Sequence, residues 1–418
     1  MAIAPNVFKY TDFLSMDTLR ILKNKLMLAG YFNTDDKNDF GQAFPVGTTV
    51  RKQFPWRAMS TEGLPYNPQS IQRRETSITI DQNIQVAWEY DSFEKALKME
   101  RGEAALRKAY SEPAANEIAQ QIESRAALWA TNHCNNFVGV LGTNPTSFQQ
   151  TSGAARRTLI EMAAWQGKKG FIVSPGVQES MVAAAMNLFQ DSDSISKQYK
   201  EGSIGRQGGF DWFESMSLYS HVAATWQGTV EVTSTLATDG TTTMVLTCTS
   251  GDTFKKGDKF SIAAVKAANP ATRRSTGRSK LFTILSADQT ISGTSATITY
   301  SPPIYGPGSA YQNVDAYPVA GADLTLFPGT TSPNGKEGII GFAITNDAFA
   351  LAGVKLDGPE SSGDTVCSQI QDPNSGLAVR YLRQFDARSS SWINRIDCAL
   401  GFGDFYVDNC VGILSGPA

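Results

Sequence analysis

The sequence predicts an α+β protein that carries a small all-β insertion. Three observations predict this class. An apolar repeat of 3.6 residues over positions 111–132 indicates one long helix, and several strictly alternating stretches indicate strands. The composition then changes at about residue 224, because positions 228–300 contain seventeen threonines and no helical repeat. At 418 residues the chain is long enough for more than one hydrophobic core.

The first 90 residues predict an N-terminal arm followed by an extended β-loop. In the arm, residues 1–45, leucines recur through positions 14–28 and predict one amphipathic helix. In the β-loop, residues 46–90, apolar and polar side chains alternate from Val50 to Trp56 and again from Ile78 to Trp88. This alternation predicts two long strands, and the polar, proline-containing connection between them is too long for a tight turn.

Residues 91–223 predict a region of mixed helices and strands. The long helix over positions 111–132 begins with Ser111 as its cap and Pro113 in its first turn. Its apolar side chains share one face, which leaves four polar side chains toward solvent: Glu117, Gln121, Glu123 and Arg125. Positions 154–166 predict a second helix, and a short buried strand at 171–173 precedes a third helix that runs to about residue 190.

Residues 224–327 predict the inserted module. Five short strands make a small barrel or sandwich. They are expected at positions 229–232, 243–248, 259–265, 279–285 and 296–300. After a stretch rich in proline and glycine, the host domain resumes over residues 328–418. Its strands are expected at positions 338–344, 392–402 and 405–414.

The residues that usually carry catalysis or bind metals are scarce. His133 and His221 are the only histidines, and no Ser-containing nucleophile elbow accompanies His221. The five cysteines have no C-x-x-C spacing, which excludes a zinc knuckle and is typical of buried thiols in a reducing compartment. We therefore expect no catalytic residue, no metal site and no cofactor. No stretch reaches membrane-spanning length, so no membrane partner is expected.

Charge is close to balanced overall but uneven along the chain. The net charge of −3 argues against a protein that wraps nucleic acid, because phosphate binding needs a basic excess. Between Phe254 and Lys280, however, eight basic residues face the single acid Asp258. Four of the eight lie close together: Arg273, Arg274, Arg278 and Lys280. This cluster is either a solvated loop or a docking surface, and it lacks the interleaved aromatic residues of a nucleic-acid platform.

Several segments resemble the coat proteins of short-tailed enterobacterial phages. They are YKEGSIGRQGGFD at 199–211, FIVSP at 171–175, FKKGDKFSIAAVK at 254–266, TITYSPP at 297–303 and YQNV at 311–314. Their order along the chain also matches that family. The resemblance implies an HK97-like capsid fold, with an N-terminal arm, an extended β-loop, a spine helix at about 111–132, and peripheral and axial domains. In that fold, residues 224–327 form the inserted β domain, and 267–280 correspond to a long loop.

The function implied by this resemblance is that of a major capsid protein, which assembles into the icosahedral head shell around the DNA genome. The implied partners are identical subunits in pentamers and hexamers, an internal scaffolding protein and a portal protein, with packaged DNA held only weakly. The implied location is the virion capsid, after assembly in the bacterial cytoplasm.

Contacts between such subunits are expected to involve nine basic side chains that pair with acids of neighbouring copies. Five belong to the β-loop and four to the inserted module: Arg51, Lys52, Arg57, Arg73, Arg74, Arg273, Arg274, Arg278 and Lys280. Two alternatives remain open at this point. One is a β-rich phage tail or adhesin-type binding protein, although such proteins usually lack a long amphipathic helix. The other is a hydrolase that uses carboxylates, which no residue spacing supports.

Overall fold

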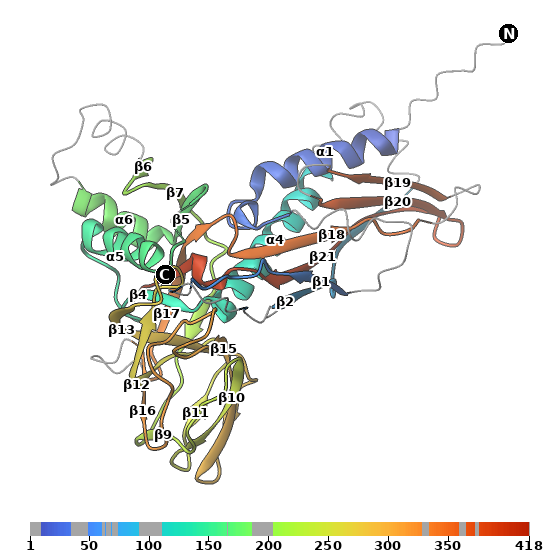
Figure 1. The fold of residues 1–418 in the computed structure, drawn as a ribbon. Coiled ribbons are helices and arrows are strands. Elements are labelled where there is room, and N and C mark those ends of the chain that lie inside the picture. The colour runs from blue at the N-terminus through green and yellow to red at the C-terminus, as the bar shows by residue number, and fades with distance from the viewer. Residues whose placement is uncertain are drawn as a thin grey trace. The chain divides into compact units, whose positions relative to one another are not determined.

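The computed structural model divides into two compact units (Figure 1). It describes residues 10–34, 49–60, 63, 68, 74–91, 111–164, 166–185, 204–327, 334–358, 365–372 and 376–417. The first unit comprises Met1–Lys52, Thr76–Ala126 and Ala350–Gly403, and the second comprises Gln53–Glu75, Ala127–Phe349 and Asp404–Ala418. The long helix α4 (Glu112–His133) contributes residues to both units.

A five-stranded sheet forms the centre of the first unit. The order is β18-β21-β20-β19, with β3 also paired to β21. The strands are β3 (Gln82–Asp91), β18 (Phe349–Val354), β19 (Thr365–Gln371), β20 (Ala378–Asp386) and β21 (Ser391–Asp404). Helix α1 (Tyr10–Lys25) lies along β19 and β20, which confirms the helix predicted in the arm (Figure 1).

Glu123 of α4 is buried, which corrects the prediction that it faces solvent. Its carboxylate accepts three backbone hydrogen bonds, from the N–H groups of Met27, Leu28 and Ala29 at 2.7, 3.0 and 3.1 Å. These donors belong to the turn that follows α1, where they have no helical acceptor. Glu123 therefore supplies the acceptor that three otherwise unpaired N–H groups need. Burial raises its pKa, and the three backbone hydrogen bonds oppose that shift.

A seven-stranded mixed sheet lies in the second unit. Its order is β4-β22-β17-β5-β7-β6, with β8 also paired to β17. The strands are β4 (Asn136–Gly139), β5 (Lys169–Val173), β6 (Arg206–Gln207), β7 (Phe210–Glu214), β8 (Ser220–Val222), β17 (Glu337–Thr345) and β22 (Cys410–Leu414). Helices α5 (Phe148–Glu161) and α6 (Pro175–Ala185) pack against this sheet. Aromatic side chains pack in its core, where the Phe171 ring stacks on Trp212 with centroids 3.9 Å apart.

Six strands of the second unit close into a barrel. Their order is β10-β15-β13-β12-β16-β9. Two short strands from the same stretch of sequence, β11 (Thr253–Phe254) and β14 (Gln289–Thr290), form a separate two-stranded sheet. The six are β9 (Val230–Val232), β10 (Thr241–Thr247), β12 (Lys259–Ala268), β13 (Ser275–Ile284), β15 (Ser295–Ile304) and β16 (Asp323–Leu326). Three aromatic rings, Phe260, Phe282 and Tyr300, fill the interior. Exposed Thr243, Val245 and Thr247 of β10 alternate with buried Met244 and Leu246, which is the period-two pattern seen in the sequence.

The strand and helix predictions are confirmed in kind, with corrections at their boundaries. The strand predicted from Val50 to Trp56 ends at Gln53, and the barrel has a sixth strand, β16, that was not predicted. The strand predicted across positions 78–88 is two strands, β2 (Glu75–Thr79) and β3, because β2 pairs with β1 (Thr49–Gln53) whereas β3 pairs with β21. The last predicted strand, 405–414, is β strand only from Cys410, since a 3₁₀ turn occupies Val407–Asn409.

Two further corrections concern the helix predicted at 154–166 and the loop predicted at 267–280. The helix predicted at 154–166 begins earlier, at Phe148, because the Ser147 hydroxyl caps it. Residues 267–280 form a hairpin of β12 and β13 rather than a long loop. Residues 186–190, where the third helix was expected to end, lie outside the described residues. No helix in the described part of the chain has the length and apolarity needed to cross a bilayer.

Candidate functional site

The structure describes eight of the nine basic side chains of the predicted subunit contacts. Arg51 and Lys52 lie on β1, and Arg73 lies outside the described residues. The other six all belong to the second unit: Arg57, Arg74, Arg273, Arg274, Arg278 and Lys280. Arg274 is exposed in the turn of the β12–β13 hairpin, whereas the remaining five contact other parts of their own chain.

Arg74 lies among three aromatic rings, which the sequence did not reveal. Its guanidinium carbon is 5.2 Å from the Phe54 centroid, 5.4 Å from that of Tyr305 and 5.2 Å from that of Tyr311. The Phe54 N–H also donates to the Arg74 carbonyl at 2.9 Å, so the two ends of the β-loop connection are joined. A planar cation can stack on several rings at once, which a lysine cannot do as well. This cage fixes the β-loop connection to the segment that follows β15.

Phe54 extends the aromatic contacts toward the C-terminal part of the chain. Its ring centroid lies 5.4 Å from that of Phe405 and 5.2 Å from that of Tyr406. Tyr305 and Tyr311 contact one another at 5.9 Å. Such contacts add roughly 0.5–1.5 kcal/mol per aromatic pair beyond the buried area. Positions 54, 74, 305 and 405 are far apart in sequence, and no local pattern brings them together.

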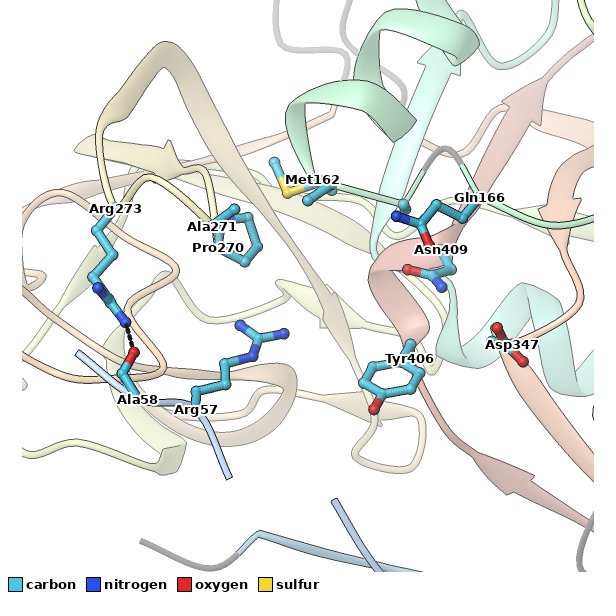
Figure 2. Close-up of a pocket in the computed structure, with 12 residues that line it drawn as sticks. Arg57, Ala58, Met162, Gln166, Pro270, Ala271, Arg273, Asp347, Tyr406 and Asn409 are labelled. Carbon is cyan, nitrogen blue, oxygen red and sulfur yellow. Dashed lines mark hydrogen bonds between the residues drawn. The ribbon is translucent and has the colours of Figure 1, made fainter. Parts of the chain in front are cut away.

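Arg57 and Arg273 meet at an open pocket of about 500 Å³ (Figure 2). The Arg273 Nη2 donates to the Ala58 carbonyl at 2.8 Å, and the Arg57 guanidinium lies 5.7 Å from the Tyr311 centroid. Figure 2 shows Arg57 reaching into the pocket between Pro270 on one side and Tyr406 on the other. The pocket is lined by Arg57, Ala58, Met162, Ala163, Ala164, Gln166, Pro270, Ala271, Arg273, Asp347, Tyr406 and Asn409.

Arg278 and Lys280 bind acids of their own chain. Arg278 Nη1 lies 3.1 Å from the Glu161 carboxylate at the end of α5 and donates to the Thr158 hydroxyl at 3.1 Å. Lys280 is 1% exposed, and its Nζ lies 3.2 Å from Asp408. A buried ammonium needs such a partner because desolvation is costly. These two side chains therefore attach β13 of the barrel to the neighbouring helix and to the turn before β22.

Lys259 of β12 is a buried lysine that was not among the predicted contact residues. Its Nζ donates to the Thr131 carbonyl at 2.6 Å and lies 4.4 Å from the Phe137 centroid. Thr131 is in the last turn of α4, where carbonyl groups lack helical partners and the helix dipole favours a positive charge. Burial nevertheless lowers the pKa of Lys259 from 10.5 to about 7, while Cys134, Asp258 and Cys410 oppose that shift. In the sequence, this position belongs to the Lys-Gly-Asp-Lys pattern of the segment at 254–266, and nothing in that pattern predicts that the side chain is buried.

Both histidines are held in structural contacts. His221 Nε2 lies 3.0 Å from buried Asp258, whose carboxylate also accepts from the Ala224 and Lys255 N–H groups. His133 stacks on Trp129, with centroids 4.1 Å apart, and its Nδ1 lies 2.6 Å from Asp404. Across the described residues, no three His, Cys, Asp or Glu side chains are grouped as a metal site would require.

All five cysteines are unpaired thiols, and four of them are buried. The charged and aromatic side chains described above fix the β-loop connection, the barrel and the seven-stranded sheet to one another within the second unit. A family model described as "P22 coat protein - gene protein 5" matches residues 76–407. This match spans most of the chain, and the protein belongs to the P22 coat protein family.

Solved structures that resemble the chain were also found. One match over most of the chain is titled "Mycobacterium phage Che8", with a TM-score of 0.48, 10% identity, and coverage of 94% of this chain and 92% of that chain. A second match is titled "Asymmetric unit of bacteriophage PhiM1 mature capsid". It has a TM-score of 0.42 and 9% identity, and it covers 88% of this chain and 82% of that chain. The "CUS-3 coat protein I-domain" is 26% identical over 24% of this chain and 95% of that chain, with a TM-score of 0.19. No curated protein sequence matches the chain.

Membership of the coat protein family establishes the function at this level. The chain is a major capsid protein that forms the phage head shell, and its place is the virion capsid. Many identical copies assemble into that shell. The family match decides against the tail or adhesin-type alternative.

Proposed function

We propose that the chain builds an icosahedral shell of pentamers and hexamers with an HK97-like fold, in which the barrel of residues 224–327 is an inserted domain. The observation that carries this proposal is the family match, whose span of residues 76–407 includes the barrel and segments on both sides of it. The barrel's first and last strands, β9 and β16, pair with each other through Glu231 and Asp323. Both ends of the module therefore emerge together, as an insertion into a host domain requires.

The proposed division of the chain follows the elements described above. Residues 1–45 form the arm, 46–90 the extended β-loop, 91–223 the spine helix, peripheral domain and first part of the axial domain, and 328–418 the remainder of the axial domain. The β1–β2 pair and the helix α4 support the assignment of β-loop and spine.

The inserted barrel acts in this proposal as a folding support for the host. Polar contacts join the two, because Thr283 Oγ1 donates to the Cys134 carbonyl at 2.7 Å and Asn135 Nδ2 donates to the Ser301 hydroxyl at 3.3 Å. Together with Lys259 and Lys280, they fix the end of α4 and the start of β4 against the barrel. Expressing residues 224–327 alone tests the domain boundary. A cooperative unfolding transition supports an autonomous domain, and an unfolded fragment contradicts it.

Further partners belong to the same proposal. An internal scaffolding protein and a portal take part in assembly in the bacterial cytoplasm, the shell holds packaged DNA only weakly, and the subunit has no enzymatic activity. The net charge of −3 supports weak DNA contact, since a strongly basic inner wall would bind phosphates tightly. Contacts of the predicted basic side chains with neighbouring copies are also part of the proposal, except at Lys280, which is buried and binds Asp408 of its own chain.

Expression of the chain with and without its scaffolding protein tests the shell directly. Electron microscopy and sedimentation are expected to show closed, uniform particles in at least one of the two conditions. Only small oligomers in both conditions would contradict the proposal. Particles that retain icosahedral symmetry after image averaging would support pentamers and hexamers as the building units.

A further inference from the structure

The pocket between Arg57 and Arg273 presents two positive charges and one carboxylate, that of Asp347. In the described part of the chain, neither guanidinium forms an ion pair, although both are held in place by the contacts described above. The Arg273 Nε is buried and has no hydrogen-bond partner among the described residues. By comparison, Arg278 and Lys280 of the same hairpin both contact an acid. Two guanidinium groups that no acid among the described residues pairs with can bind a carboxylate from another chain.

The backbone around this pocket is held in an uncommon conformation. Ala163 and Arg273 have φ values of 57° and 56°, in the left-handed region that residues other than glycine rarely adopt. Ala163 places the chain after α5 along one wall, and Arg273 turns its own side chain toward Ala58. Such local strain often marks functional sites and gives a site that is formed before its ligand arrives.

The lining favours a protein segment over a free anion or nucleic acid. Beside the two arginines, one wall carries Met162, Ala164 and Pro270, which suit the apolar part of a peptide. The volume of about 500 Å³ accommodates a few side chains. The acids needed are present in the same sequence: outside positions 254–280 there are 29 basic and 39 acidic side chains.

We propose that this pocket receives an acidic segment of a second copy of the chain, with its carboxylate bound by Arg57 and Arg273. The inference rests on the proposed shell, since only there do copies meet at high local concentration. It makes two of the nine basic residues a defined receptor. The remaining lining groups, the amides of Gln166 and Asn409 among them, supply further hydrogen-bond donors to such a segment.

Zero-length cross-linking in assembled shells tests this contact. The Arg57→Lys variant places an amine in the pocket, and a carbodiimide joins that amine only to a carboxylate in direct contact. Shells are assembled from an equal mixture of ¹⁴N- and ¹⁵N-labelled full-length subunits, and cross-linked peptides are identified by mass spectrometry. The matched control is Arg206→Lys, because Arg206 lies 3.6 Å from Asp211 of its own chain on an exposed strand.

The isotopic composition separates the possible results. If a second copy fills the pocket, about half of the cross-links from the introduced amine join ¹⁴N to ¹⁵N peptides, and unassembled subunits give none of these. The control gives cross-links of one isotope only. Pocket cross-links of one isotope only, such as to Asp347 of the same chain, would overturn the inference, as would the absence of pocket cross-links beside a working control. Failure to form particles at all would instead count against the proposed shell.

Discussion

The buried amine of Lys259 makes stability depend on pH in a direction that can be measured. Its pKa is about 7 in the folded protein and 10.5 when the side chain is solvated. Between these values the unfolded chain binds a proton that the folded chain has released. Raising the pH through this window therefore raises the free energy of unfolding. Below pH 7 both states are protonated, so this side chain no longer makes stability depend on pH.

The expected size follows from the same two values. Each pH unit in the window contributes about 1.4 kcal/mol, so the free energy of unfolding gains about 2 kcal/mol from this group between pH 6.5 and 8.5. Cysteine thiols act in the opposite sense as the pH approaches their normal range, because burial raises the pKa of Cys398 to about 12 and also raises that of Cys410. The effect must therefore be measured as a difference between variants that share these thiols.

Urea unfolding of the unassembled subunit at pH 6.5, 7.5 and 8.5 provides the measurement, with wild type compared to Lys259→Met. The stability of wild type relative to the variant is expected to rise by about 2 kcal/mol across the series. Lys266→Met, which removes an exposed lysine from the same strand, is the control and is expected to run parallel to wild type. Parallel curves for Lys259→Met would refute the assignment of a deprotonated, buried amine.

Three further substitutions test contacts in both units, each by urea unfolding. Glu123→Ala leaves three backbone N–H groups of Met27–Ala29 without an acceptor and is expected to cost roughly 3 kcal/mol; a cost below about 1 kcal/mol would contradict that role. Asp408→Asn removes the partner of buried Lys280 and is expected to cost about 2–3 kcal/mol, which Lys280→Met in the same chain should largely restore. Arg74→Lys is expected to lower the free energy of unfolding by about 1 kcal/mol, because an ammonium stacks less well on the rings. An unchanged urea midpoint would show that the aromatic cage does not need a planar guanidinium.

The sequence predicted the elements of this fold far better than their contacts. Periodicity depends on one face of an element being buried, so α4 and the barrel strands were visible in the pattern of residues such as Ile118, Ile122, Met244 and Leu246. The break between β2 and β3 was not visible, because both strands keep the same alternation while they pair with different partners. Strand pairing is a tertiary choice that alternation alone does not encode.

Buried polar residues were the second limit. Glu123 occupies a position that helical periodicity assigns to solvent, and its burial depends on unpaired N–H groups about 95 residues earlier in the chain. Lys259 and Lys280 similarly looked like members of a solvated basic cluster. The acceptor of Lys259 is a carbonyl at the end of α4, and that of Lys280 is an acid in the turn before β22. Such partners are defined only once the barrel is docked.

These buried charges explain why the contact between the barrel and the rest of the second unit is polar. Exchanging a buried ion pair for apolar residues of the same shape is often neutral or stabilising, so Lys280 and Asp408 are a poor source of net stability. These charges have a larger effect on arrangements in which the barrel is docked incorrectly. A barrel docked in a shifted position would leave Lys259 and Lys280 buried without acceptors, at a cost of several kcal/mol for each. The polar contacts thus penalise incorrect docking, and a shell subunit that must present the same surfaces in every copy depends on that penalty.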